Sequence, residues 1–146
     1  MGKGLKIQTL RTELGDVLIG RDLPLTAEEV EALRLSVGWA VRGDYQRILE
    51  EGLLTVSARL DQGLVGYLQV VGSPSGDVLI HDVCVRPDLQ RQGVGTRMME
   101  VALEACKEMA PQGVNVLFEE ENLPFFRRFG FRIMRGGYLD SVSLGR

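Results

Sequence analysis

Histidine and cysteine are scarce in this chain of 146 residues. It has one histidine, His81, and two cysteines, Cys84 and Cys106. A single histidine excludes histidine-rich metal sites such as HExxH, and the two cysteines lack the spacing of a zinc site or a disulfide scaffold. We therefore expect no metal site, and we expect both thiols to be buried in the core.

Long apolar runs are also absent. The most apolar stretch, residues 77–85, falls well short of the roughly 20 residues that cross a bilayer, and residues 1–4 are not followed by the apolar run of an export signal. We expect a cytoplasmic protein without a membrane span. The net charge of −3, with both signs interspersed, argues against a nucleic-acid partner and mildly favours a cationic small substrate.

The composition is that of one ordinary globular domain covering residues 1–146. Hydrophobic residues make up 45% of the chain and charged residues 25%. Near the N-terminus, residues 6–10 have a strand-like composition, and a polar, glycine-punctuated stretch follows over residues 11–25. Thr26 and Glu29 form a capping box that predicts a helix ending near Gly38. A second short helix is expected over residues 44–51, closed by Gly52 in a left-handed conformation.

The middle of the chain has the pattern of an antiparallel meander. Residues 53–60 and 64–71 are β-rich and are separated by a short glycine-containing turn, which predicts a hairpin. A further turn leads into a third strand over residues 78–85. A helix of about four turns is expected over residues 96–110 from its apolar face.

After this helix, residues 114–118 should form a strand parallel to the strand that precedes the helix, because a helical crossover joins the two. Residues 124–129 are expected to form a short helix and residues 131–134 a final strand. The order of elements predicts an α+β fold, with a mixed sheet and helices on its faces.

A glycine turn separates the third strand of the meander from the long helix. It contains Gln90, Gly93 and Gly95, and the amides at the start of a helix favour an anion such as a phosphate. Arg91 and Arg97 add positive charge beside it. A P-loop is excluded because the chain has no Gly-Lys-Ser/Thr, and a dinucleotide fingerprint fits poorly because Met98 stands where its third glycine or alanine is needed.

With this turn and a second block, the sequence resembles the GNAT superfamily of acyl-CoA-dependent N-acyltransferases. The resemblance covers residues 53–134 and depends on the segment 82–95, with its [QR]-x-x-G-x-[GA] pattern, and on the segment 124–131, which ends in Phe-Gly-Phe. It implies a mixed, mostly antiparallel sheet that is flanked by helices and splayed at the cofactor site. The alternative interpretation is a glycine turn that only starts a helix and binds no ligand.

The resemblance also implies acetyl-CoA as the acyl donor and assigns residues to it. The backbone of residues 83–85 would pair with the pantetheine arm, residues 91–96 would surround the pyrophosphate, and residues 122–126 would border the cofactor on the other side. The residues expected at the acyl-CoA are Val83, Cys84, Val85, Gln90, Arg91, Gln92, Gly93, Val94, Gly95, Thr96, Asn122 and Phe126.

Two side chains are candidates for removing a proton from the acceptor amine. His81 has the only side chain whose ordinary pKa lies near neutrality, and arylalkylamine-acetylating relatives place a histidine here; the alternative is a structural histidine. Its neighbour Asp82 should face the other side of the sheet unless a bulge intervenes. Glu119, in a run of three glutamates, is the second candidate, although such runs are usually solvated.

Phe126 departs from the family pattern. Relatives commonly have at this position a tyrosine that protonates the departing CoA thiolate, which a phenyl ring cannot do. Tyr138 or water would have to substitute, or the thiolate would leave unaided.

The expected function is direct transfer of an acetyl group from acetyl-CoA to a primary amine of a small molecule. Trp39 and Tyr45 could form an aromatic wall for the amine or belong to the core. A non-catalytic acyl-CoA-binding regulatory module and a protein N-terminal or lysine acetyltransferase remain as alternatives, and a homodimer is left open.

Overall fold

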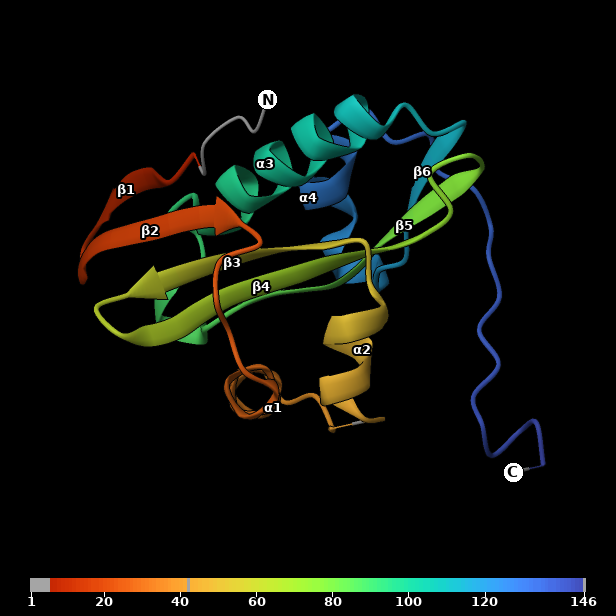
Figure 1. Ribbon diagram of the computed structural model, residues 1–146, viewed down its shortest axis with the longest axis horizontal. Coiled ribbons are helices and arrows are strands. Elements are labelled where there is room, and N and C mark those ends of the chain that lie inside the picture. The colour runs from red at the N-terminus through yellow and green to blue at the C-terminus, as the bar shows by residue number, and fades with distance from the viewer. Residues whose placement is uncertain (1–5, 42, 146) are drawn as a thin grey trace. The chain divides into compact units, whose positions relative to one another are not determined.

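The computed structural model describes residues 6–41 and 43–145, which divide into two compact units, one ending at Val116 and the other beginning at Leu117. In the first unit, α3 covers one face of a curved sheet and α1 and α2 cover the other (Figure 1). None of the described helices is both long and apolar enough to span a bilayer. The strands are β1 (Gln8–Thr12), β2 (Gly15–Arg21), β3 (Leu54–Leu60), β4 (Gly63–Gly72), β5 (Asp77–Val85) and β6 (Gly113–Val116). The α-helices of this unit are α1 (Ala27–Ser36), α2 (Tyr45–Glu51) and α3 (Val94–Met109), and the short 3-10 helix is η1 (Pro87–Leu89).

The sheet has six strands in the order β1-β2-β3-β4-β5-β6. All neighbours are antiparallel except β5 and β6, which are parallel and are joined by α3. The predicted α+β class and mixed, mostly antiparallel sheet are confirmed. So is the parallel strand after the long helix, although β6 ends two residues before the predicted position.

Strand β2 was missed by the sequence interpretation, which assigned residues 11–25 to a polar connection. A tight turn joins β1 to β2, in which the Thr12 hydroxyl donates to the Gly15 carbonyl over 2.6 Å. Val17 and Ile19 then alternate with more exposed neighbours and are completely buried. Two buried apolar residues among glycines and charges are enough for a strand because β3 supplies the pairing partner and α3 covers the buried face.

Both N-terminal helices form as predicted, with one correction at a helix end. Thr26 and Glu29 make the reciprocal capping box at α1, and Asp44 caps α2. Gly52, however, has φ −72°, so it is not left-handed. Glycine is needed there because a Cβ atom would collide with the side-chain amide of Gln69 on β4.

Glycine also lets α3 approach the sheet closely. A Cβ atom on Gly66 of β4 would lie 2.6 Å from the Met98 sulfur of α3. Both residues therefore belong to one tightly packed layer, in which Met98, Met99 and Ala102 are completely buried. The helix begins at Val94, two residues before the predicted start.

The second unit contains the short helices η2 (Glu120–Asn122) and α4 (Leu123–Arg127). The short helix predicted near Pro124 is thus confirmed. The strand predicted over residues 131–134 is wrong, because no strand is assigned from residue 117 to 145. A β-rich tetrapeptide becomes a strand only beside a partner strand, and the backbone of residues 131–134 has none.

Candidate active site

The glycine turn is built around two residues with left-handed backbone. Arg91 has φ 64° and Gly93 has φ 91°, and Gly93 immediately precedes α3. Two glutamine side chains hold the turn: Gln90 Nε2 donates to the Val85 carbonyl over 2.9 Å, and Gln92 Nε2 donates to the Asp88 carbonyl over 3.2 Å. The turn is therefore held in shape by hydrogen bonds within the protein.

The N-terminus of α3 fits the pyrophosphate that the sequence analysis places there. Within the described part of the chain, no side chain caps this helix, and the first amides of a helix have no acceptor inside the helix. Gly93 has no Cβ to obstruct an anion. Arg91 is exposed, and no ion pair holds its guanidinium within the described residues, whereas Arg97 donates to Gln8 over 3.0 Å. Arg91 is thus the better candidate for a phosphate ligand.

Strand β5 has an open edge beside this turn. The pairing of β5 with β6 ends at Ile80 and Val116, so within the first unit residues 81–85 are paired only with β4. The backbone amides and carbonyls of Val83, Cys84 and Val85 therefore include groups on an unpaired edge. This is the geometry expected for pairing with the pantetheine amides, and it forms the splay in the sheet.

A β-bulge interrupts β5 at the same place. Gln69 of β4 lies opposite His81 and Tyr67 opposite Cys84, so one extra residue stands on β5, and Asp82 has φ 58°. The bulge changes the alternation of side chains, as the sequence analysis allowed. Gln69 donates to the Ile48 carbonyl of α2 and Asp82 contacts α1 and α2, so His81 and Asp82 both project toward the helices α1 and α2.

Asp82 is held by one residue from each of these helices. Arg34 Nη1 of α1 lies 2.7 Å from Asp82 Oδ2, and the Tyr45 hydroxyl of α2 donates to the same oxygen over 2.9 Å. Arg34 also donates through Nε and Nη2 to the Ala40 carbonyl and lies over the rings of Trp39 and Tyr45. We call Arg34, Tyr45 and Asp82 the Asp82 clasp.

His81 stands at the exposed side of the clasp. Its side chain is 46% exposed, and its Nδ1 lies 3.6 Å from Asp82 Oδ1. That distance is too long for a hydrogen bond. Among the predicted catalytic residues, His81 is therefore the one that combines solvent access with a fixed carboxylate neighbour and lies next to the open edge of β5.

Burial keeps the thiol and the two tyrosine hydroxyls in and around the Asp82 clasp neutral. It raises the pKa of the Cys84 thiol to about 12, and the nearby Asp82 carboxylate adds to the effect. Burial and Asp82 likewise raise the pKa values of the hydroxyls of Tyr45 and Tyr67. Tyr45 thus keeps its proton and donates a hydrogen bond to Asp82, and Cys84 is no nucleophile.

The sequence interpretation missed Arg34. It named Trp39 and Tyr45 as an aromatic wall and treated Asp82 only as the neighbour of His81. A signal was available, since position 34 lies four residues after Val30 and next to Leu33 on the apolar face of α1, where a charged side chain needs a partner.

Three predicted site residues lie in the second unit. Phe126 is buried and stacks on Phe118 with ring centroids 4.7 Å apart, Asn122 precedes α4, and Glu119 is exposed before η2. Their roles at the acyl-CoA or in proton transfer stay predictions.

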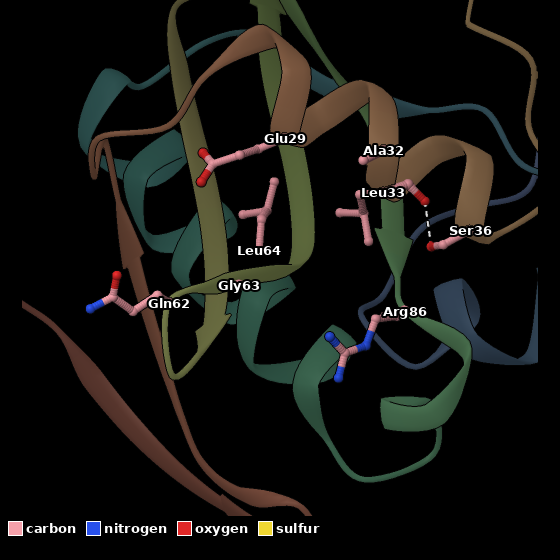
Figure 2. Close-up of a pocket in the computed structure, with 8 residues that line it drawn as sticks. All are labelled: Glu29, Ala32, Leu33, Ser36, Gln62, Gly63, Leu64 and Arg86. Atoms are coloured by element: carbon pink, nitrogen blue, oxygen red, sulfur yellow. Dashed lines mark hydrogen bonds between the residues drawn. The ribbon is translucent and has the colours of Figure 1, made fainter.

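A separate pocket of about 330 Å³ lies between α1, the turn from β3 to β4, and Arg86 (Figure 2). None of its lining residues is a predicted site residue. Its charged groups are paired within the protein, Glu29 with Arg59 and Arg86 with Asp88. The lining residues are Glu29, Ala32, Leu33, Ser36, Gln62, Gly63, Leu64 and Arg86.

Comparison with known proteins is consistent with this geometry. The Porphyra purpurea protein named uncharacterized N-acetyltransferase ycf52 is 25% identical over 83% of this chain and 73% of its own length. Streptothricin acetyltransferase A of Bacillus subtilis is 31% identical over 44% of this chain and 38% of its own. The structure of a GNAT family acetyltransferase from Streptococcus pneumoniae has a TM-score of 0.75 at 27% identity, with 86% of this chain and 98% of that chain covered.

The family model described as Acetyltransferase (GNAT) domain matches residues 51–133. That span contains β5, the glycine turn and α3. The chain belongs to the GNAT acetyltransferases and is an acyl-CoA-dependent acetyltransferase.

Proposed function

We propose that this protein transfers the acetyl group of acetyl-CoA directly to a primary amine of a small molecule. The observation that carries the proposal is the position of His81, which is exposed, has a carboxylate neighbour, and lies at the start of the open edge of β5. A proton acceptor at this edge would stand beside the acyl donor if the donor pairs with residues 83–85.

Each part of the site has a separate task. The turn from Gln90 to Thr96 holds the pyrophosphate through Arg91 and the first amides of α3, and the β5 edge orients the pantetheine arm. When bound, the thioester supplies the acetyl group and a thiolate leaving group. His81 takes a proton from the substrate ammonium, which leaves a neutral amine as the nucleophile, and a backbone amide among residues 83–85 polarises the carbonyl.

A small-molecule acceptor is supported by one relative and by the sequence. The matched Bacillus subtilis protein is named for streptothricin. The net charge of −3 also favours a cationic acceptor over an anionic one. A cytoplasmic location, a homodimer and the absence of a nucleic-acid partner stay predictions.

A non-catalytic acyl-CoA-binding module is the second candidate, and Phe126 is the observation that favours it. The ring has no proton to give to the thiolate. Acetylation of a protein N-terminus or lysine is the third candidate, and turnover with peptides instead of small amines would distinguish it from the other two.

The proposal is tested with acetyl-CoA, a panel of small primary amines and an N-terminal and a lysine peptide, with free thiol release as the signal. We expect turnover with at least one small amine. His81→Ala should lower kcat by about 10²–10⁴-fold without changing the Kd for acetyl-CoA. Asp77→Asn, at the far end of β5, is the control and should retain activity. Turnover with peptides alone would contradict the small-molecule acceptor, and binding of acetyl-CoA without any turnover would favour the regulatory module.

A further inference from the structure

The two oxygens of Asp82 have different partners. Oδ2 receives both Arg34 Nη1, at 2.7 Å, and the Tyr45 hydroxyl, at 2.9 Å. Oδ1 lies toward His81, 3.6 Å from Nδ1. The clasp therefore fixes which oxygen of the carboxylate faces the imidazole.

We propose that Asp82, held by Arg34 and Tyr45, is a positioning residue that keeps the proton of neutral His81 on Nδ1, so that Nε2 is the nitrogen that accepts the substrate proton. This inference rests on the proposed function for the role of His81. The position of the proton itself is a property of the protein without substrate.

Rigidity of the clasp supports the assignment. The Arg34 side chain is 9% exposed and the Asp82 side chain 11%. Arg34 uses Nε and Nη2 on the Ala40 carbonyl, which leaves Nη1 for Asp82. Three elements, α1, α2 and β5, thus determine the orientation of one carboxylate, and rotation of Asp82 would leave a buried cation and a buried hydroxyl without their acceptor.

Among the described residues, the charged group that contacts His81 is Asp82, through Oδ1. Arg34 can only donate, and the hydroxyl hydrogen of Tyr45 is committed to Asp82 Oδ2, since burial and Asp82 raise the pKa of the tyrosine and keep it protonated. On β4, Gln69 uses its amide nitrogen on the Ile48 carbonyl of α2. Within the described residues Asp82 Oδ1 has no other hydrogen-bond donor, and even at 3.6 Å its negative charge favours a proton on the facing Nδ1 over one on the more distant Nε2.

The proton transfer balances without a further reactant. The substrate ammonium loses one proton to His81 Nε2, giving a neutral amine and an imidazolium whose Nδ1–H lies beside Asp82. Because the histidine side chain is 46% exposed, the imidazolium can return this proton to water. Asp82 gives and takes no proton in this step, and its ion-pair partner is Arg34.

The variant Asp82→Asn tests the proposal because it should move the proton of neutral His81 from one ring nitrogen to the other. Arg34 and Tyr45 both donate to the position of Oδ2, so the amide oxygen of asparagine must take that position. The amide nitrogen then faces His81 and donates to Nδ1. Neutral His81 must consequently carry its own proton on Nε2. This nitrogen can then no longer accept the proton of the substrate.

The experiment is a long-range ¹H–¹⁵N NMR measurement on the full chain without ligand, at a pH where the imidazole is neutral. His81 is the only histidine, so its two nitrogens give the only imidazole signals. We expect the Nδ1–H tautomer in the unmodified protein and in the control Asp77→Asn, and the Nε2–H tautomer in Asp82→Asn. Asp82→Asn should also lower kcat by about 10²–10⁴-fold while the Kd for acetyl-CoA stays unchanged.

An Nε2–H tautomer in the unmodified protein would overturn the proposal, and that measurement does not depend on whether any variant folds. An unchanged tautomer in folded Asp82→Asn would overturn it as well. The two proposals fail separately. The expected tautomers, together with no turnover of any amine, would support the positioning role of Asp82 and contradict the proposed function. Turnover that depends on His81 but not on Asp82 would support the proposed function and contradict the positioning role of Asp82.

Discussion

Replacement of Arg34 by methionine tests the energetic role of the Asp82 clasp. The substitution keeps most of the length of the side chain but removes the cation that lies 2.7 Å from Asp82. Because the two side chains are only 9% and 11% exposed, Asp82 would be left as a buried, uncompensated charge. Loss of one partner of a buried pair costs about 3–5 kcal/mol, which corresponds to a fall in Tm of about 10–16 °C for a chain of this size.

Asp82→Asn should cost less, about 2 kcal/mol, because the amide oxygen still accepts from Arg34 and Tyr45. Arg34 also keeps the Ala40 carbonyl and the rings of Trp39 and Tyr45. The double variant contains neither buried charge, so its cost should be smaller than the sum of the single costs, by about 2 kcal/mol.

The assay is urea unfolding followed by circular dichroism and by the fluorescence of Trp39, the only tryptophan. Arg47→Met is the matched control. Arg47 also lies 2.9 Å from a carboxylate, that of Glu51, but the two side chains are 72% and 63% exposed, so its loss should cost at most about 0.5 kcal/mol. Equal costs for Arg34→Met and Arg47→Met, or additive costs in the double variant, would refute the buried clasp.

Two further predictions concern the thiols and the thiolate leaving group. Burial raises the pKa of Cys84 to about 12 and also raises that of Cys106. Neither thiol should therefore react with iodoacetamide at pH 8 until the protein is unfolded. Rapid alkylation of the native chain, measured by mass spectrometry, would contradict the burial of the two thiols. Phe126→Tyr should raise kcat if protonation of the thiolate limits turnover, with the Kd for acetyl-CoA as the control. An unchanged rate would mean that water or another group protonates it.

Elements specified by neighbouring residues could be predicted from the sequence. The capping box of Thr26 and Glu29 forms within one turn of helix, and the hairpin of β3 and β4 closes over a short turn. The glycine turn is local as well, since Gly93 has to adopt φ 91° and the bracing glutamines lie within five residues of their acceptors.

Features that depend on distant partners could not be predicted in the same way. Residues 15–21 form strand β2 because β3 pairs with them. Residues 131–134 form no strand because no other strand pairs with them. The bulge at Asp82 needs β4 for its register, and only the folded chain shows that Arg34 lies beside it. The sequence interpretation could therefore name His81, and Tyr45 as an aromatic residue, but not the contacts of Arg34 and Tyr45 with Asp82.

The most direct test of the acyl-CoA site is calorimetric binding of acetyl-CoA to the unmodified protein and to Gly93→Asp and Gly93→Asn. Both substitutions strain the left-handed backbone at φ 91° to a similar extent, since asparagine and aspartate have the same shape, and the Cβ has ordinary space, 3.7 Å from Leu10. The two variants differ only in charge. We expect binding by the unmodified protein, and binding by Gly93→Asp that is more than about tenfold weaker than by Gly93→Asn, because a carboxylate repels the pyrophosphate. Equal affinities of the two variants, or no binding by the unmodified protein, would contradict the site.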